Sequence, residues 1–118
     1  MRVGRTLNVE VAMSIGLPKS KIGEQVTFKP PKAIGGSRIT GRITDEVWTG
    51  PHADPAWGQY AFFSQLIEWR GSNQASVRLG YYHRKSDADR WIFGQFCLEG
   101  SPAEIKTHLD ATLAKSWF

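Results

Sequence analysis

The sequence predicts an α+β domain, in which a curved antiparallel β-sheet of four to six strands, ordered as a meander, carries one C-terminal α-helix on one face. The first reason is that strand-like segments follow one another through residues 38–98 with short connections, whereas parallel strands need crossovers of about a dozen residues or more. The second is that residues 101–117 carry a helix start signal and then apolar residues at helical spacing. A chain of 118 residues fits a single domain, residues 1–118.

Residues 1–37 form a basic segment that we expect to contribute one or two strands. Every odd-numbered position in residues 7–17 is apolar, which is the alternation of a strand with one buried face. Residues 25–29 are a second, shorter candidate strand. Residues 30–37 contain two prolines and two glycines and are expected to form a loop.

The antiparallel meander is expected over residues 38–98. Residues 38–48 alternate as a strand, and residues 49–58 are rich in turn-forming residues and are expected to be a loop. Residues 59–70 are apolar on both faces. This segment is therefore predicted to be the central strand of the sheet.

Two polar turns shape the rest of the meander. A compact turn at residues 71–73 leads to a strand over residues 75–84, and a second turn at residues 85–89 leads to a last strand over residues 90–98. Both turns are too short for a crossover connection. Consecutive strands are therefore expected to pair with each other.

The predicted helix begins at a sequence signature for an N-terminus. Ser101 suits the N-cap, Pro102 suits the first helical position, and Glu104 completes a capping box. Apolar residues then recur at steps of four and predict a stripe that packs on the sheet. The stripe consists of Ile105, Leu109, Leu113 and Trp117.

The formal net charge of +4 is unevenly distributed along the chain. Residues 1–42 hold eight Lys or Arg and two Glu, a charge of +6, whereas residues 43–118 hold seven against nine, a charge of −2. A basic segment favours nucleic acid, an anionic surface or an acidic protein partner. A net charge of this size is also typical of proteins that use it only for solubility.

One face of the predicted meander interleaves aromatic and basic side chains. Rings stack on bases while guanidinium groups neutralise phosphates, a combination that suits single-stranded nucleic acid. The leading hypothesis is a small non-enzymatic binding module that uses this face. The residues assigned to it are Arg42, Trp48, Arg78, Tyr82 and Arg84.

The alternative is that this face is covered, either by the N-terminal strands or by a second copy of the chain. A sheet with two apolar faces needs two covers, and the single predicted helix supplies one. In this alternative the chain is a protein-interaction or homodimerisation module.

A third hypothesis is a small-ligand site or an enzyme at the mouth of the loops. Strict alternation would point Asp45 inward, and a β-bulge nearby would return it to solvent. The histidines do not share metal-ligand spacing, and the common nucleotide-binding, nucleophile and zinc-finger motifs are absent. We therefore assign no catalytic residue, metal or cofactor, and rank binding above catalysis. The candidate residues are Asp45, His52, Asp54 and His83.

Cys97 is the only cysteine, so an internal disulfide is excluded, and its apolar neighbours predict a buried, inert thiol. No uncharged apolar run reaches the roughly 18 residues of a membrane span, and no signal peptide is expected. We expect a cytoplasmic protein without membrane contact.

Overall fold

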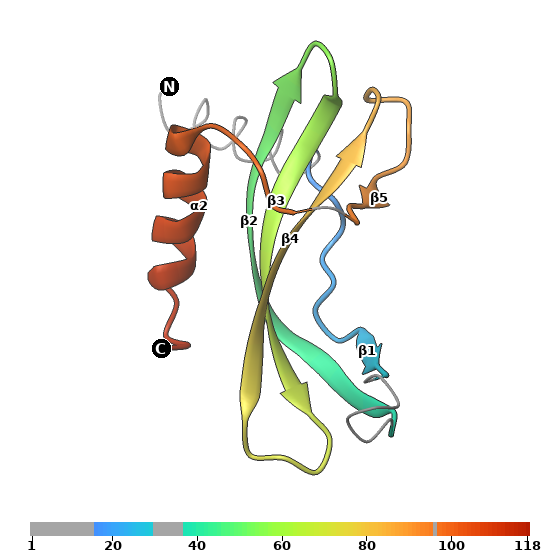
Figure 1. Ribbon diagram of the computed structural model, residues 1–118, viewed down its shortest axis with the longest axis vertical. Coiled ribbons are helices and arrows are strands. Elements are labelled where there is room, and N and C mark those ends of the chain that lie inside the picture. The colour runs from blue at the N-terminus through green and yellow to red at the C-terminus, as the bar shows by residue number, and fades with distance from the viewer. Residues whose placement is uncertain (1–15, 30–36, 96) are drawn as a thin grey trace, which may run out of the picture.

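The computed structural model describes residues 16–29, 37–95 and 97–118, and shows a five-stranded antiparallel sheet that curls into a half-barrel beside the C-terminal helix (Figure 1). The strands lie in chain order across the sheet, so the predicted meander and the α+β fold class are confirmed. The elements are β1 (Gln25–Phe28), β2 (Ile39–Asp54), β3 (Gly58–Trp69), β4 (Ala75–Arg84), β5 (Ile92–Phe93) and α2 (Pro102–Leu113).

The N-terminal segment is described only in part. β1 confirms the short strand predicted at residues 25–29. The strand predicted over residues 7–17 and the loop predicted over residues 30–37 fall almost wholly outside the described residues; Gly16 and Leu17, which are described, do not belong to the sheet. Among the described residues, no helix has the length and apolar character needed to cross a membrane.

The register gives the sheet two distinct faces, because side chains alternate along a strand and directly paired residues point the same way. The face that α2 covers, called the helix face, includes Thr49 of β2 and Ser64 of β3. The opposite face, called the far face, includes Trp48 of β2 and Phe63 of β3, which pair directly. The chain that leads into β1 runs along the far side of the sheet from α2 (Figure 1).

A first β-bulge in β2 changes which residues share a face. The pairing with β3 skips Thr44, which lies between Ile43 and Asp45. Because a shift of one residue reverses the alternation, Arg42 points to the helix side of the sheet while Trp48 lies on the far face. The sequence alternation had predicted that Arg42 and Trp48 share one face, and the bulge makes that prediction wrong.

A second bulge, between Thr49 and His52, extends β2 to Asp54. The loop predicted over residues 49–58 is therefore mostly strand, and only its last part forms the β2–β3 turn. Gly50 has a φ of +116°, a backbone conformation open mainly to glycine, and so allows the strand to pass through this Gly-Pro step. The turn-forming residues Gly50 and Pro51 therefore lie in a β-bulge within β2 and not in a loop.

β3 is the centre of the fold, as predicted. Its five consecutive side chains at residues 61–65 are all buried, so both faces of the strand are covered. Phe63 lies over Gly80 of β4, where a Cβ atom would come 2.6 Å from the ring, so glycine is needed for this close approach. Among residues 16–29, 37–95 and 97–118, the buried apolar core is small and consists of Ile43, Ala61, Phe62, Phe63 and Ile67.

β5 is much shorter than the strand predicted over residues 90–98. Only Ile92 and Phe93 pair with β4, and the Gly94 N–H then donates to the Tyr81 carbonyl at 2.8 Å. The chain leaves the edge after this point because it has to reach the helix face to begin α2 (Figure 1). Cys97 lies in this crossing and is exposed, so the prediction of a buried thiol is wrong.

The N-terminus of α2 is built as predicted. The Ser101 hydroxyl accepts a hydrogen bond from Glu104 N at 3.1 Å, and the Glu104 carboxylate accepts one from Ser101 N at 3.0 Å. These reciprocal bonds satisfy backbone donors that a helix start otherwise leaves free. The capping box is confirmed.

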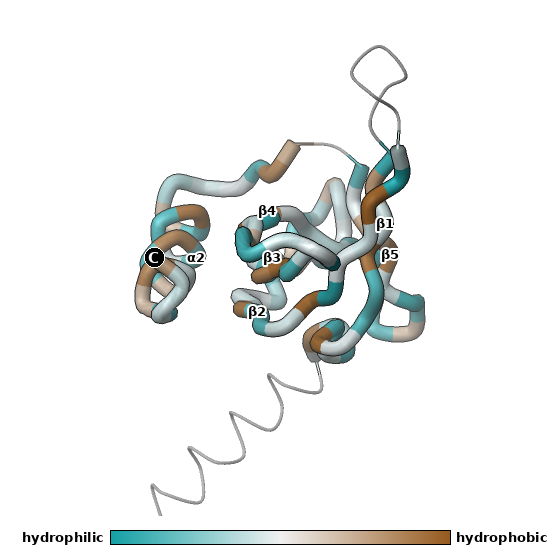
Figure 2. The backbone as a smooth tube through the Cα atoms, turned by 90° about the horizontal axis from the view of Figure 1, so that it is seen from below, coloured by the Kyte–Doolittle hydropathy of each residue, from teal (hydrophilic) through white to brown (hydrophobic). Residues whose placement is uncertain are grey.

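The packing face of α2 is not the predicted apolar stripe. Leu109 and Leu113 are 42% and 64% exposed, whereas His108 and Thr112 are buried against the sheet. Figure 2 shows that the apolar positions of α2 are not confined to the side nearest the sheet. The reason is that the helix face presents hydroxyl groups, which need hydrogen-bonding partners once they are buried.

Candidate functional site

Three of the residues assigned to a nucleic-acid face, Trp48, Arg78 and Tyr82, meet on the far face. The Trp48 ring centroid lies 5.6 Å from that of Phe63 and 5.5 Å from that of Tyr82, and Phe93 lies 5.5 Å from Tyr82. We call these four rings the aromatic cluster. The Arg78 guanidinium carbon is 5.9 and 5.7 Å from the ring centroids of Phe63 and Phe93, within cation–π range.

The aromatic cluster is partly covered by the chain itself. The Lys21 backbone N–H donates to the Glu46 carboxylate at 2.9 Å, and the Lys21 ammonium lies 5.2 Å from the Tyr82 ring centroid. Arg78 donates from Nε and Nη2 to Gln65 Oε1 at 3.0 and 2.7 Å. Burial lowers the pKa of Arg78 and raises the pKa of Tyr82. Three rings of the cluster are therefore covered wholly or in part within the fold, whereas Phe93 is 44% exposed.

The other two residues assigned to that face lie elsewhere. Arg42 is exposed on the helix side of the sheet. Arg84 is at the end of β4, where its Nε donates to Gln59 Oε1 at 2.6 Å and its Nη2 lies 3.4 Å from Asp87 Oδ1. The Arg84 guanidinium carbon stacks 4.2 Å from the Trp91 ring centroid. Arg84 is thus fixed in place at one end of the sheet.

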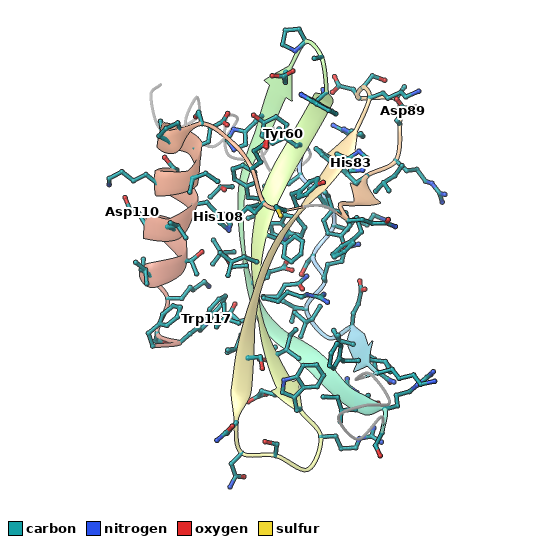
Figure 3. All side chains as sticks on the ribbon, viewed as in Figure 1. Tyr60, His83, Asp89, His108, Asp110 and Trp117 are labelled. Carbon is teal, nitrogen blue, oxygen red and sulfur yellow. The ribbon has the colours of Figure 1, made fainter. Side chains whose placement is uncertain are left out.

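A hollow of about 860 Å³ lies beside Arg84, and we call it the end hollow. One wall is the β2–β3 turn, where Trp57 is 80% exposed. The other wall is the connection between β4 and β5, and Figure 3 shows His83 and Asp89 at this end of the sheet. The titratable residues of the lining are His83, Arg84, Lys85, Asp89 and Arg90.

Sequence reasoning found this site only in part. It assigned His83 and Arg84 to two different hypotheses, and it missed Trp57, Lys85 and Arg90. One signal was available, because Trp57 stands among Pro and Gly residues in a turn, where a large ring seldom serves the core.

Two of the four residues predicted at the loop mouth have local structural roles. Asp54 accepts hydrogen bonds from two backbone N–H groups of the β2–β3 turn, at 2.8 and 3.1 Å. The bulge at Thr44 turns Asp45 towards the helix side, where Trp117 Nε1 donates to it at 2.9 Å and Lys115 Nζ at 3.3 Å. The Trp117 hydrogen bond is the largest of the interactions that hold the pKa of Asp45 below its ordinary value.

The other two, His52 and His83, flank Tyr60 on the helix face. The Tyr60 hydroxyl donates to Glu104 Oε1 at 2.9 Å, and His52 Nδ1 lies 3.4 Å from Glu104 Oε2. A hydrogen bond from the Ser101 backbone is the main cause of the lowered pKa of Glu104, while burial and then Glu104 raise the pKa of Tyr60 to about 12. This cluster ties the first turn of α2 to the sheet.

A buried relay of hydroxyl and imidazole groups continues the contact between α2 and the sheet. Ser64 Oγ lies 2.8 Å from His108 Nε2 and 2.7 Å from Thr112 Oγ1, and Thr49 Oγ1 lies 2.7 Å from His108 Nδ1. Burial lowers the pKa of His108, so its ring is neutral at pH 7. A serine beside a neutral histidine can act as a nucleophile. Here both side chains are 0% exposed and out of reach of a substrate, so the relay is structural.

The fold and the end hollow together define an α+β half-barrel domain with a concavity at one end of its sheet, lined by one exposed tryptophan and by three Lys or Arg side chains. In the part of the chain that the structure describes, no group of three or more His, Cys, Asp or Glu side chains is placed to hold a metal ion. Comparison with protein-family models, curated proteins and solved structures found no match to this chain. A function has to be inferred from the site itself.

Proposed function

We propose that the chain is a small non-enzymatic binding module that contacts single-stranded nucleic acid at the end hollow. One observation carries the proposal. The Arg84 guanidinium, stacked on Trp91, lines a hollow that also presents the exposed ring of Trp57.

The chemistry of the lining suits bases and phosphates together. Every base has a flat π face, and stacking one on an aromatic side chain contributes about 1–3 kcal/mol. Trp57 is 80% exposed, so its ring is available for such a contact. Arg84, Lys85 and Arg90 supply three positive charges against two negative charges, from Asp89 in the lining and from Asp87, which pairs with Arg84, an excess of one that attracts phosphate.

The hollow is also partly preorganised. The Arg84 side chain is 12% exposed and is held by Gln59 and Asp87, so binding would cost it little further side-chain entropy. A hollow of about 860 Å³ is within the usual size range of small-molecule sites, large enough for a nucleotide.

The end hollow is a better candidate than the far face. On the far face Lys21 lies over the Tyr82 ring and Trp48 packs against Phe63 and Tyr82, so those rings are already used within the fold. Trp57, which lines the end hollow, is 80% exposed and has no comparable cover from the part of the chain that the structure describes.

The test is fluorescence anisotropy with a labelled, mixed-sequence single-stranded oligonucleotide at low and moderate salt. Trp57→Ala is expected to weaken binding roughly 5- to 150-fold, the equivalent of about 1–3 kcal/mol. Lys85→Ala combined with Arg90→Ala is expected to weaken binding and to reduce the slope of log affinity against log salt by about one unit or more.

A matched control removes the same charge elsewhere. Arg70→Ala combined with Lys106→Ala also lowers the formal net charge of +4 by two, and both residues are exposed and lie outside the lining of the hollow. This control is expected to stay within about twofold of the unmodified chain. Equal losses in the two double variants, or an unaffected Trp57→Ala variant, would show that the hollow is not the binding site.

Homodimerisation is a second candidate, favoured by the amount of exposed apolar surface. Among the described residues ten large apolar side chains are exposed, whereas five hydrophobic residues are buried. Exposed apolar groups gathered in patches are typical of association surfaces. Size-exclusion chromatography with light scattering tests this: a dimer has twice the chain mass of 13.2 kDa, and a monomer at micromolar concentration counts against it.

A further inference from the structure

We propose a second binding surface, independent of the end hollow: a groove on the far face, between β1 and β4, that takes an extended peptide strand carrying a carboxylate beside its apolar side chains. Strand addition of this kind joins two chains through backbone hydrogen bonds and seats alternate side chains in a groove.

The groove is a hollow of about 370 Å³ lined by four strands of the half-barrel. Phe28 of β1 and Ile39 of β2 pair directly and are 51% and 42% exposed. Large apolar side chains left open in a concave site gain free energy when a partner covers them. The apolar lining consists of Val26, Phe28, Ile39, Ile67 and Trp69.

Both strands that border the groove have unpaired backbone edges within the described residues. β1 pairs only with β2 in the described part of the chain, so no described strand pairs with its other edge. β4 pairs with β5 only at Tyr82 and His83, so residues 75–80 have no described partner strand on that side. Unpaired N–H and C=O groups on a strand edge are a template for another strand.

The charge of the lining identifies the partner's chemistry. Among the described residues, Arg78 is the only charged one that lines the groove. Its hydrogen-bond acceptor is the neutral Gln65 Oε1, and no described carboxylate is in ion-pair contact with it. Gln65 is 1% exposed, and its Nε2 has no hydrogen-bond partner. A peptide carboxylate would give Arg78 a charged partner in place of a neutral one.

The experiment uses two synthetic peptides of alternating valine and threonine, identical except that one central threonine is glutamate in the first and lysine in the second. Each is titrated into the full ¹⁵N-labelled chain and followed by NMR. We expect the glutamate peptide to bind at least about tenfold more tightly. We also expect amide hydrogen exchange at residues 75–80 or in β1 to slow on binding, because an added strand supplies new backbone hydrogen bonds.

Two variants test the charge and the groove separately. Arg78→Gln is expected to reduce the preference for the glutamate peptide to about twofold or less. Because Arg78 also packs on the aromatic cluster, its replacement could disturb the fold, so a second variant changes a half-exposed position of the groove. Phe28→Asp is expected to weaken binding of the glutamate peptide by about tenfold. Leu113→Asp, on the exposed side of α2, is the matched control and should change neither value.

Several outcomes would overturn the proposal. The proposal is excluded if the chain binds the two peptides with equal affinity, or if amide hydrogen exchange is unchanged at both strand edges. It is also excluded if Arg78→Gln and Phe28→Asp both keep the preference for the glutamate peptide. Concentration-dependent protection of residues 75–80 without peptide would show that the occupant is a second copy of the chain. Because Phe28 lies outside the end hollow, Phe28→Asp should leave oligonucleotide binding unchanged, so failure here is distinguishable from failure of the proposed function.

Discussion

Ser64 Oγ lies 2.8 Å from His108 Nε2 across the contact between β3 and α2, and both side chains are 0% exposed. A helix that packs on a sheet ordinarily buries apolar side chains. Here the buried residues of α2 are a histidine and a threonine, His108 and Thr112. Docking of the helix therefore depends on hydrogen bonding and on the protonation state of one ring.

Ser64→Ala is expected to destabilise the fold by about 1–3 kcal/mol. The variant removes the hydrogen-bond partner of the buried His108 Nε2 and one of the partners of the buried Thr112 Oγ1. Urea unfolding followed by circular dichroism measures the change. Ser116→Ala, at an exposed position, is the control and should stay within about 0.5 kcal/mol of the unmodified chain. Equal losses in the two variants would contradict a role for the relay in stability.

Acidification is expected to weaken the fold through His108. Burial lowers its pKa below the ordinary 6.5, so below about pH 6.5 the unfolded chain takes up a proton that the folded chain does not. The stabilisation is complete above pH 6.5 and is lost as the pH falls from there through the folded pKa. Urea midpoints at pH 7.5 and 5.5 test this, and the pH dependence should shrink in His108→Gln. A midpoint that rises on acidification would contradict the assignment.

Trp117→Phe is expected to raise the pKa of Asp45 towards its ordinary 3.8, because the indole hydrogen bond is the largest interaction lowering it. The lowered pKa stabilises the fold above pH 3.8, and this contribution is lost as the pH falls through the folded pKa. Asp45 is 35% exposed, so loss of the bond should cost about 1 kcal/mol or less at pH 7. A carboxyl ¹³C NMR titration measures the pKa, and Trp57→Phe, remote from Asp45, should leave it unchanged.

Gly80→Ala is expected to cost about 1–3 kcal/mol, because the new methyl group would lie 2.6 Å from the ring of Phe63. A double-mutant cycle separates this clash from the strand preference of alanine. In combination with Phe63→Leu, which leaves more room, Gly80→Ala should cost less than it does alone. Additive losses in urea unfolding would show that the two residues do not interact.

Leu113→Gln is expected to change stability by no more than about 0.5 kcal/mol, since this side chain is 64% exposed and faces away from the sheet. The periodicity of the sequence predicts the opposite, because it places Leu113 in the packing stripe. A loss above about 2 kcal/mol on urea unfolding would restore the stripe as the packing face.

The features that the sequence predicts correctly have strong local signals. Ser101 and Glu104 form the capping box from residues three apart, and residues 59–70 carry apolar side chains at both odd and even positions, as a central strand requires. Short turns then determine the meander, because they permit only neighbouring strands to pair.

The errors come from interactions between distant parts of the chain. The residues around Thr44 do not mark it as a bulge, because the alternation of apolar and polar residues continues through it. The bulge depends on how β2 aligns with β3, which leaves Thr44 without a paired residue. The rotation of α2 depends on hydroxyl groups at Thr49 and Ser64, far from His108 in sequence. The end hollow brings Trp57 and Arg90 together although they are far apart in the sequence. They lie at the same end of the sheet because β3 and β4 have similar lengths, and a sequence pattern does not determine those lengths exactly.

The polar contact of α2 has a consequence for how the protein opens. Separating the helix from the sheet breaks the hydrogen bonds of His108 and uncovers the Phe62 ring that packs on it, whereas the rest of the sheet core stays buried. Because the denaturant dependence of an opening reaction scales with the surface it uncovers, amides of α2 are expected to exchange through a subglobal fluctuation with a smaller urea dependence than global unfolding. Amides of β3, buried on both sides, should exchange only when the whole domain unfolds.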